Sequence, residues 1–292
     1  MPKGQSKGGS ALLCSMHSLL NEAYQHGYAI PAFNTYNYAS IRSVFEAADE
    51  LQTPVIIAFG ENVSHVMDLE SVVEIVRALS TRYPVPVALH LDHAKSFELI
   101  LRAIRAGFTS VMYDGSADPY EENVAQTRKI VEIAHAVGVS VEAELGAVAA
   151  GRDTDEEDSV EQLTDPLLAR SFVESTAVDA LAVSIGTVHG LYSGEPKIDL
   201  ERLKDIRSNV SVPLVLHGGS GTPRAILLQA IQFGVAKVNV NTEVSKAGVA
   251  AIQKLLAAQP GAHMSHLTVA VKDGMKVVVK RYLEMLTAES LL

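Results

Sequence analysis

The sequence predicts an α/β fold, a single (β/α)8 TIM barrel with parallel strands. Three observations support this prediction. The chain of 292 residues contains eight short runs of apolar or β-branched residues. Longer segments with apolar residues at i, i+3 and i+4 separate these runs, which is the pattern of helices buried on one face. No linker or change of composition divides the chain, so the eight repeats belong to one unit, as a barrel of about 250 residues requires.

The eight predicted strands are mostly apolar on both faces, as expected of parallel strands that helices cover. They lie at residues 28–34, 54–59, 85–93, 109–114, 139–145, 180–186, 212–218 and 236–241. The predicted helices lie at residues 40–51, 69–82, 97–106, 121–137, 166–175, 200–209 and 223–233. A doubly wound open sheet shows the same alternation, but it usually carries a glycine-rich turn after its first strand. Residues 34–37 read Asn-Thr-Tyr-Asn, without glycine, which favours the barrel.

Composition and charge argue against several classes of function. The formal net charge is −10 and no run of Lys or Arg occurs, so we expect no binding to nucleic acid or to an anionic membrane. No apolar run approaches the roughly 18 residues of a membrane span. Cys14 is the only cysteine, which excludes a disulfide framework within the chain and favours a reducing, cytoplasmic location. Residues 1–10 are small, polar and basic, and are predicted to be a flexible lead-in to a barrel domain over residues 11–292.

Polar side chains gather at the C-terminal ends of the predicted strands. They are Asn34, Asp92, His93, Asp114, Glu144, His189, His217, Asn239 and Asn241. In a parallel barrel these ends converge on one mouth, so residues far apart in sequence become neighbours. Because a buried charge or imidazole is costly without partners, residues of this kind at the strand ends indicate a functional site.

Three of these residues, His93, His189 and His217, are histidines from three different strand ends. Imidazole suits Zn²⁺, and three protein ligands leave one coordination position for a substrate. A single such histidine is more often a hydrogen-bonded core residue than a ligand, but three at one barrel mouth favour a metal site. His90 lies two residues before Asp92 and is equally compatible with a supporting role at the site and with a purely structural one.

A glycine-rich segment, HGGSG at 217–221, precedes the helix predicted from Pro223. Glycines let backbone N–H groups approach an anion, and a helix N-terminus adds a favourable dipole. Barrels often bind phosphate with the loops after strands seven and eight, and residues 239–242 follow the eighth strand. The segment between Gly146 and Asp165 is acidic, has no apolar helical face and is predicted to be a mobile loop over the same mouth.

Eight segments then point to a known family. They are YAIPAFN (28–34), ALHLDH (88–93), SVMYDGS (110–116), EENV (121–124), VSVEAELG (139–146), GTVHGLYSGEPKID (186–199), VPLVLHGGSGTP (212–223) and KVNVNTE (237–243). Together, in this order and spacing, they resemble the class II, zinc-dependent fructose- and tagatose-bisphosphate aldolases. The resemblance runs from about Tyr28 to Glu243, and LHLDH combined with VHG and LHGGSG is highly specific.

The resemblance implies a reaction and a set of roles. The reaction is reversible aldol cleavage of a ketose phosphate to dihydroxyacetone phosphate and an aldehyde through a zinc-stabilised enediolate, as in glycolysis and related carbohydrate metabolism. Asp92 matches the residue that shuttles a proton, and His93, His189 and His217 match the zinc ligands. Asp114 and Glu144 match a second, displaced metal site.

The resemblance also implies how the substrate is held and how the protein assembles. The substrate contacts it implies, together with Asn34 from its place after the first strand, are Asn34, Gly190, Gly218, Gly219, Ser220, Asn239, Asn241 and Thr242. Some members bind a monovalent cation, Na⁺ or K⁺, near the phosphate. Family members form homodimers or homotetramers, so the implied partners are a small phosphosugar and further copies of the chain.

The sequence departs from the family pattern at several positions. Gly60 stands where many members have Ser or Thr, and Ala117 stands where many have His. The loop motif G-G-x-E-D, whose Glu moves a proton at C3, is replaced by residues 149–153, AAGRD. Glu156, in the acidic run that follows, is our candidate for that carboxylate, although the run could equally be a solvated surface. The usual small and basic C-terminal ending is also missing.

Three alternative functions stay open at this point. A Schiff-base aldolase would need a buried lysine, for which Lys237 and Lys95 are the candidates. A phosphosugar-binding accessory subunit could keep the metal and phosphate sites without turnover. A metal-dependent isomerase or epimerase could use the same enediolate. The sequence does not fix the sugar, which could be fructose, tagatose, a deoxy-keto sugar acid or a longer chain.

Overall fold

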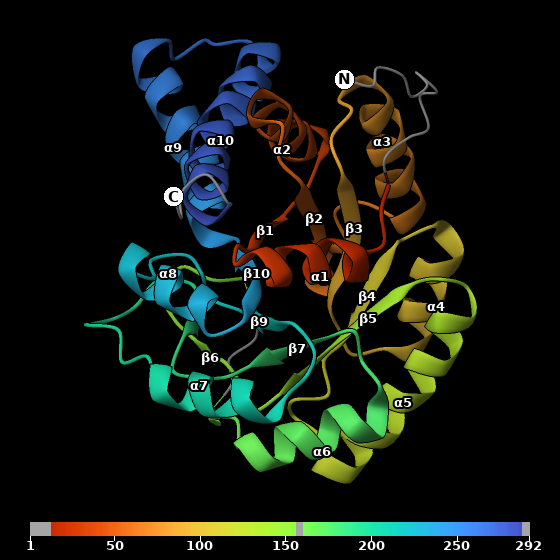
Figure 1. Ribbon diagram of the computed structural model, residues 1–292. Coiled ribbons are helices and arrows are strands. Elements are labelled where there is room, and N and C mark those ends of the chain that lie inside the picture. The colour runs from red at the N-terminus through yellow and green to blue at the C-terminus, as the bar shows by residue number, and fades with distance from the viewer. Residues whose placement is uncertain (1–12, 156–159, 288–292) are drawn as a thin grey trace, which may run out of the picture.

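Eight parallel strands close into a barrel in the computed structural model, which describes residues 13–155 and 160–287 (Figure 1). The strands are β1 (Ile30–Asn34), β2 (Val55–Gly60), β3 (Val87–Ala94), β4 (Ser110–Tyr113), β5 (Ser140–Leu145), β7 (Ala180–Val183), β9 (Leu214–Leu216) and β10 (Val235–Val240). Each pairs with its neighbours along the chain, and β1 pairs with β10 to close the ring. The predicted fold class is confirmed.

Helices follow the strands and surround the barrel. They are α2 (Tyr38–Leu51), α3 (Leu69–Arg82), α4 (Phe97–Ala106), α5 (Tyr120–Ala136), α6 (Pro166–Thr176), α7 (Leu200–Asn209), α8 (Arg224–Gln232) and α9 (Thr242–Ala258). Several begin at a side chain that accepts a backbone N–H, such as Asn37 before α2 and Asp165 before α6. These caps satisfy donors that have no partner inside the helix, so the polar residue at each boundary sets where the helix starts.

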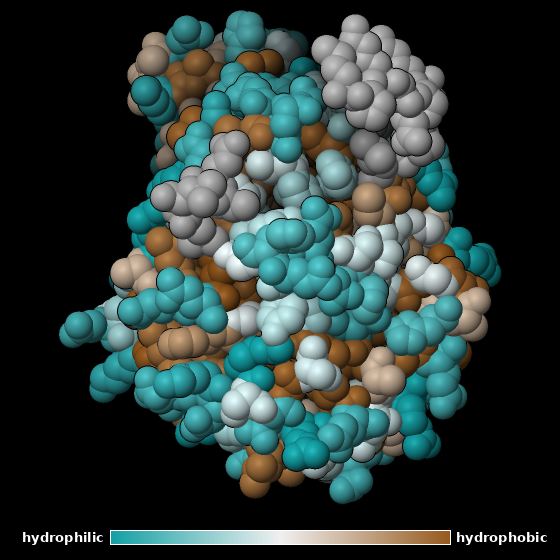
Figure 2. All heavy atoms as spheres, in the orientation of Figure 1, coloured by the Kyte–Doolittle hydropathy of each residue, from teal (hydrophilic) through white to brown (hydrophobic). Residues whose placement is uncertain are grey.

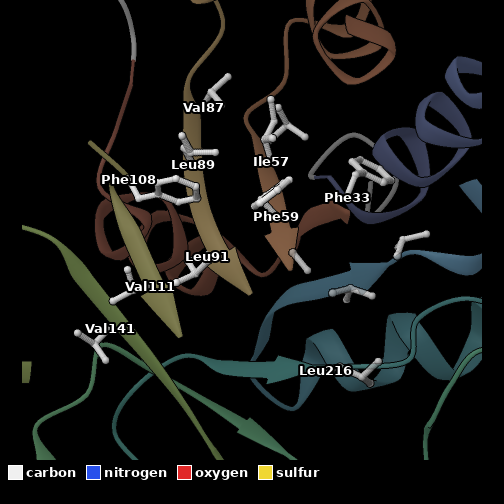
Figure 3. Packing of buried hydrophobic residues seen from close by; sticks show 14 of the residues in the cluster. Phe33, Ile57, Phe59, Val87, Leu89, Leu91, Phe108, Val111, Val141 and Leu216 are labelled. Carbon is white, nitrogen blue, oxygen red and sulfur yellow. The ribbon is translucent and has the colours of Figure 1, made fainter. Parts of the chain in front are cut away.

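The alternation of side chains along β3 divides the core into two parts. Val87, Leu89 and Leu91 point outward into the apolar layer under the helices (Figure 3). The residues that alternate with them, including His90 and Asp92, are buried and contact residues of other strands in the barrel interior. A strand places successive side chains on opposite faces, so one run supplies both the packing layer and the interior of the barrel.

The lower interior of the barrel is filled by apolar side chains, several of them alanines, and is covered by a helix. Ala32, Ala88, Ala182 and Ala236 pack there with residues of α1 (Met16–His26). Figure 1 looks onto this end of the barrel, with α1 lying across it. The outer face of α1 is largely hydrophilic in Figure 2, whereas its buried face is apolar. The opposite end, where the strands finish, is therefore the open mouth.

The last helix, α10 (Met264–Leu286), lies against α2 and α9. Lys272 Nζ lies 2.6 Å from Glu46 Oε2, and Lys276 and Lys280 both pair with Glu50. Val279 and Leu283 lie on the apolar face of α10 and are fully buried. The helix thus ties the C-terminal part of the chain to the first repeat of the barrel. Within the described residues, none of the helices combines the length and the apolar run that a bilayer crossing requires.

Part of the segment expected to be a mobile loop has regular structure. Its residues Ala149–Ala150 form β6, which pairs with β8 (Val188–His189) in a small parallel sheet. Ala147 also bridges Gln162. The first half of the loop is therefore fixed against the mouth, and residues 156–159 lie outside the described residues.

Candidate active site and metal centre

A bulge in β3 turns two consecutive side chains toward the mouth. The pairing of β3 with β4 shifts between Leu91 and Ala94, and His93 has a left-handed backbone with φ of 48°. In a regular strand Asp92 and His93 would face opposite sides. Here both contribute to the site, since Asp92 contacts interior residues while His93 contacts Asp114. A strained backbone of this kind is found most often where function requires it.

Asp92 is held by two side-chain amides. Asn34 Nδ2 donates to Asp92 Oδ2 at 3.0 Å, and Asn239 Nδ2 donates to Asp92 Oδ1 at 3.1 Å. Asn34 and Asn239 lie on the paired strands β1 and β10, so barrel closure brings both donors to one carboxylate. Burial alone would raise the pKa of Asp92, but the imidazoles of His93 and His90 beside it hold that pKa well below its usual range. Asp92 is therefore an ionised group that can accept a proton.

The three histidines predicted as metal ligands lie together. One ring nitrogen of each of His93, His189 and His217 falls within 4.8 Å of the others. The ring of His93 is nearly perpendicular to those of His189 and His217, with centroids 4.9 and 4.5 Å away. They come from the ends of β3, β8 and β9, so only the closed barrel brings them together.

Two carboxylates determine which ring nitrogens of His93 and His217 carry a proton and which point toward the other histidines. His93 Nδ1 lies 2.8 Å from Asp114 Oδ2, and His217 Nε2 lies 2.9 Å from Glu142 Oε1. An ionised carboxylate only accepts, so each of these nitrogens carries the proton. The remaining nitrogens, His93 Nε2 and His217 Nδ1, then face each other 2.8 Å apart and share a hydrogen bond when one of them is protonated. Both can bind a cation once that proton is lost, and carboxylate support of this kind is typical of metal-binding histidines.

Two buried atoms beside this centre have no hydrogen-bond partner among the described residues. They are His189 Nε2 and Glu144 Oε2. Glu144 also forms a second possible ligand group with His93 and Asp114. Burial, then the nearby Asp114 carboxylate, raises the pKa of Glu144 to about 8. Two features fit a divalent metal at this position: buried ligand atoms without a hydrogen-bond partner, and a carboxyl that a nearby cation would ionise.

A charged layer that was not predicted lies in the barrel interior below the histidines. Lys237 Nζ donates to both oxygens of Glu142, at 3.0 and 2.7 Å, and Glu142 in turn accepts from His217. Lys237 and Glu142 are fully buried. The Lys237 ammonium nearby holds the pKa of Glu142 down, at about 2, against the effect of burial. The signal in the sequence was spacing, since Glu142 precedes Glu144 and Lys237 precedes Asn239 by two residues on the inward face of a strand.

His90 belongs to the same layer. Its Nδ1 lies 2.7 Å from Ser110 Oγ and its Nε2 lies 3.6 Å from Asp92 Oδ1. It lies near the histidines but is not part of either group of possible metal ligands. His90 therefore supports Asp92 from below, which is one of the two roles that the sequence left open.

Most of the predicted substrate contacts line one cleft at the mouth. Its described lining is Asn34, Asp92, Thr154, His189, Gly190, Gly218, Ser220, Asn239, Asn241 and Thr242. Gly218 has φ of 73°, and a Cβ added there would lie 2.2 Å from the carbonyl oxygen of Val188. Asn239 Oδ1 has no hydrogen-bond partner within the described chain and is left for a ligand. We call this region the phosphate cleft.

A network behind the phosphate cleft holds its backbone. Gly219 does not line the cleft; its N–H donates to Asn239 O at 2.9 Å, and its carbonyl oxygen lies 3.3 Å from the hydroxyl oxygen of Tyr282 of α10. The Tyr282 hydroxyl donates to Glu243, whose N–H donates to Ser220 Oγ at 3.2 Å. The glycine-rich loop is thus fixed from the side that faces away from the ligand.

The loop after β5 reaches over the phosphate cleft. Thr154, which was not predicted, lines the cleft, and Asn241 Nδ2 donates to Asp155 Oδ1 at 2.9 Å. The amide N–H of Asn241 donates to Asp155 and its Oδ1 accepts from Tyr36, so its side chain does not cap α9. The predicted catalytic residue Glu156 lies outside the described residues, directly after Asp155.

A second cavity, of about 500 Å³, opens on the other side of His189. Its lining includes Glu61, Asn62, His93, Lys95, Asp114, Ser116, Ala117, Glu144 and Gln162. Among the described residues, His189 alone appears in the lining of both cavities, so the two meet at the histidine centre. We call this second region the distal cavity.

Comparison with known proteins agrees with this geometry. A family model described as "Fructose-bisphosphate aldolase class-II" matches residues 14–290. The chain is 45% identical over 251 residues to a probable fructose-bisphosphate aldolase of Bacillus subtilis (strain 168), covering 85% of this chain and 88% of that protein.

Two crystal structures are also similar. The YdjI aldolase of Escherichia coli K12 has a TM-score of 0.84 and 34% identity, covering 96% of this chain and 99% of the other. A putative fructose-1,6-biphosphate aldolase of Coccidioides immitis has a TM-score of 0.85 and 33% identity, covering 94% and 97%.

Proposed function

We propose that this chain, which belongs to the class II fructose-bisphosphate aldolase family, cleaves a ketose phosphate reversibly to dihydroxyacetone phosphate and an aldehyde with Zn²⁺ as cofactor. The observation that carries this proposal is the position of Asp92. It is an ionised carboxylate beside three histidines whose nitrogens converge, at the end of a glycine-lined cleft. Proton transfer, a metal and a phosphate contact are the three requirements of this reaction.

The residues that would hold the metal are His93, His189 and His217. Three imidazoles with two carboxylate supports favour Zn²⁺ over Mg²⁺ or Ca²⁺, which prefer oxygen ligands. When bound, the metal supplies Lewis-acid stabilisation of the negative charge that develops on the ketone half during cleavage. Asp114 and Glu144, with His93, are proposed as the displaced second site.

Asp92 is proposed to accept the proton of the C4 hydroxyl in cleavage and to return it in synthesis. Its two amide donors keep one carboxylate orientation, so that the oxygen is aimed before the substrate arrives. Asn34 and Asn239 have a supporting role here in addition to their proposed contact with the substrate.

The phosphate cleft is proposed to hold the phosphate of dihydroxyacetone phosphate. Backbone N–H groups near Gly218 and Ser220 and the N-terminus of α9 at Thr242 can donate to an anion. Gly190 and Asn241 line the same cleft, and Gly219 supports its backbone. A monovalent cation, Na⁺ or K⁺, near this phosphate is part of the proposal.

A carboxylate of the loop is proposed to move the C3 proton, with Glu156 as the first candidate. Asp155, the residue before Glu156 in the sequence, accepts from Asn241 over the phosphate cleft. Glu156→Gln should then lower kcat for cleavage far more than Asp155→Asn. A larger loss in Asp155→Asn would assign the role to Asp155 instead.

The rival Schiff-base mechanism is disfavoured by the surroundings of Lys237. Its Nζ is fully buried and engaged by both oxygens of Glu142, below the layer that the substrate can reach. A nucleophilic lysine needs access to the substrate carbonyl. Borohydride trapping with substrate present should therefore leave no covalent adduct on Lys237, and the same experiment tests Lys95, which lines the distal cavity.

The decisive experiment is retro-aldol activity on a panel of ketose phosphates, read by a coupled assay for dihydroxyacetone phosphate. Activity should disappear with a chelator and return with Zn²⁺. Metal-loaded protein that cleaves no ketose would overturn the proposal, in favour of a binding subunit or an isomerase. Sedimentation of the same sample tests the proposed homodimer or homotetramer.

A further inference from the structure

We infer that the carboxylate of Asp155 and the substrate phosphate exclude each other at the side chain of Asn241, so that binding of the phosphate releases the loop after β5. The inference rests on the proposed phosphate cleft and adds a regulation to it. It comes from the hydrogen bonds that hold the loop on the cleft.

The phosphate cleft has a small set of side-chain donors. Its described lining contains no Lys or Arg, and its side-chain amides belong to three asparagines. Two of them, Asn34 and Asn239, donate to Asp92. The third, Asn241, donates from Nδ2 to Asp155 Oδ1 at 2.9 Å. Each side-chain amide of this lining is therefore engaged by a carboxylate of the chain itself, and Asn241 is the one that Asp92 does not use.

Tyr36 determines which end of the Asn241 amide can bind an anion. The Tyr36 hydroxyl donates to Asn241 Oδ1, so the Nδ2 group is the part of the amide that points away from Tyr36. An amide N–H can donate to a carboxylate oxygen or to a phosphate oxygen, since both are ionised acceptors. Asp155 and a phosphate are therefore alternative partners of the same group.

Charge makes this exclusion stronger than competition for one hydrogen bond. The Nδ2 group of Asn241 has two N–H bonds, so in principle a phosphate could accept one while Asp155 accepts the other. The two anions would then lie within about 6 Å of each other, because each acceptor lies about 3 Å from the nitrogen. Repulsion at this distance, beside a partly enclosed cleft, favours the state in which one of them has left.

The loop lies directly on the cleft because Gly190 leaves room for it. A Cβ added at Gly190 would lie 2.4 Å from the carbonyl oxygen of Arg152 and 3.1 Å from Thr154 Cβ. Thr154, the residue before Asp155, lines the cleft itself. A phosphate that fills the cleft therefore lies against the loop segment that carries Asp155.

Two further contacts hold the same segment from outside the cleft. Asn62 Nδ2 donates to the carbonyl of Asp155 at 3.3 Å, and Lys246 of α9 pairs with Asp153. Neither Asn62 nor Lys246 belongs to the described lining of the phosphate cleft, so a phosphate does not compete for them. Both contacts are exposed, and exposed contacts of this kind are weak. The side-chain contact of Asp155 is therefore the one that the phosphate controls.

The exclusion couples the phosphate to the loop in both directions. If the contact between Asp155 and Asn241 lowers the affinity for phosphate by some factor, a bound phosphate weakens that contact by the same factor. The phosphate does not react in the proposed cleavage, and Glu156, the candidate for the C3 proton, belongs to the same loop. Arrival of the phosphate thus frees the loop at the moment when the substrate is in place.

Calorimetry with inorganic phosphate on zinc-loaded protein tests the exclusion without turnover. Asp155→Asn keeps the size of the side chain and removes its charge, so Kd for phosphate should fall about fivefold to tenfold. Asp153→Asn is the matched control, because it removes the same charge from the same segment but its carboxylate pairs with Lys246. Its Kd should stay within twofold of the parent.

Three outcomes of this titration would overturn the inference. They are an unchanged Kd in Asp155→Asn, equal tightening in both variants, and phosphate that binds neither the parent nor Asp155→Asn. The second outcome would show that the charge of the loop acts in general, without a role for the contact with Asn241.

A tryptophan in the loop tests the release. The chain contains no tryptophan, and Val160, in the same loop, is 89% exposed, so Val160→Trp adds a single fluorophore outside the core. Its fluorescence anisotropy should fall as phosphate saturates the protein, with the Kd found by calorimetry. Combined with Asp155→Asn, the anisotropy should already be low before phosphate is added. An anisotropy that phosphate does not lower, or that Asp155→Asn does not change, would contradict the release.

These measurements separate the inference from the proposed function, because neither needs a reaction. Tighter phosphate binding in Asp155→Asn, without cleavage of any ketose by the parent, would support the inference and remove only the proposed reaction. Zinc-dependent cleavage of a ketose phosphate by the parent, with an unchanged Kd in Asp155→Asn, would do the reverse.

Discussion

The phosphate cleft and the distal cavity share a histidine centre but are built differently. The phosphate cleft uses glycines, amides and a helix N-terminus at the strand ends and in the segments that follow them. The distal cavity uses carboxylate side chains: Glu61 follows β2, Asp114 follows β4 and Glu144 lies on β5. Glu61 lies outside the barrel strands, so this part of the distal cavity can change by substitution without disturbing them. A barrel of this kind can therefore keep one half of its substrate and exchange the other.

The largest effect on activity is expected from Asp92, the carboxylate beside the histidine centre at which the two regions meet. Asp92→Asn keeps the size of the side chain and removes the proton acceptor; its one amide oxygen can still accept from either Asn34 or Asn239. We expect kcat to fall by about 10³-fold, within the range for a lost general base. Zinc content, measured by atomic absorption, should be unchanged. A kcat within tenfold of the parent would show that another group moves the proton.

Damage to the phosphate cleft should be the next largest effect. Gly218→Ala places a Cβ 2.2 Å from the carbonyl of Val188 and forces the loop to move. We expect KM for dihydroxyacetone phosphate in synthesis to rise by about 100-fold, since several aligned donors are lost together.

Gly138→Ala is the control for backbone strain. Gly138 also has a left-handed backbone, with φ of 76°, but an added Cβ would have nothing within 4 Å. We expect it to cost about 1 kcal/mol of unfolding free energy and to leave KM unchanged. Equal KM in the two variants would mean that the shape of the loop does not matter.

The carboxyls of the distal cavity should give a pH dependence to the metal-free protein. Burial raises the pKa of Glu144 to about 8, so the folded chain holds a proton there that the unfolded chain releases near pH 4.5. The stabilisation is therefore complete below pH 4.5 and is lost as the pH rises through about 8.

Glu144→Gln isolates this effect. The difference in unfolding free energy between chelator-treated parent and variant should change with pH between 5 and 8, by a few kcal/mol at most, and urea titrations measure it. A difference independent of pH in this window would contradict the shifted pKa. Saturating zinc should remove the dependence, because a metal favours the ionised carboxylate.

The smallest effect is expected behind the phosphate cleft. Tyr282→Phe removes the hydroxyl that donates to Glu243 and contacts Gly219 O, without creating a large cavity. KM for dihydroxyacetone phosphate should rise about threefold to fivefold while kcat changes less than twofold, because the loop is loosened and the chemistry is not. A fall in kcat alone would assign Tyr282 a different role.

The sequence predicted the strands and their helices well because both periodicities were strong. Each predicted helix begins and ends within two residues of its observed bounds. The three histidines were found because each stands at a strand end, where a polar residue interrupts an apolar pattern. Helices α1, α9 and α10 were not among the predicted segments, and α1 is the helix that covers the end of the barrel opposite the mouth.

The charged layer below the histidines was missed for a physical reason. Glu142 and Lys237 lie inside apolar runs, where a charge is expected only if it is paired. The pairing depends on barrel closure, since β5 and β10 lie far apart in the sequence, and a list of strands does not tell which inward positions face each other. The charge difference between the two cavities is hidden in the same way.

The pairing of Glu142 with Lys237 has a consequence for how the chain folds. Lys237 lies on the last strand, 95 residues after Glu142, so a chain emerging from the ribosome has Glu142 in place long before its counter-charge. Burying that carboxylate alone is costly, and a barrel of seven strands therefore cannot seal its interior cheaply. The barrel can therefore close at low cost only after β10, which carries Lys237, has been added. A fragment ending before residue 235 should stay open and bind a hydrophobic dye, and Glu142→Gln should reduce that binding.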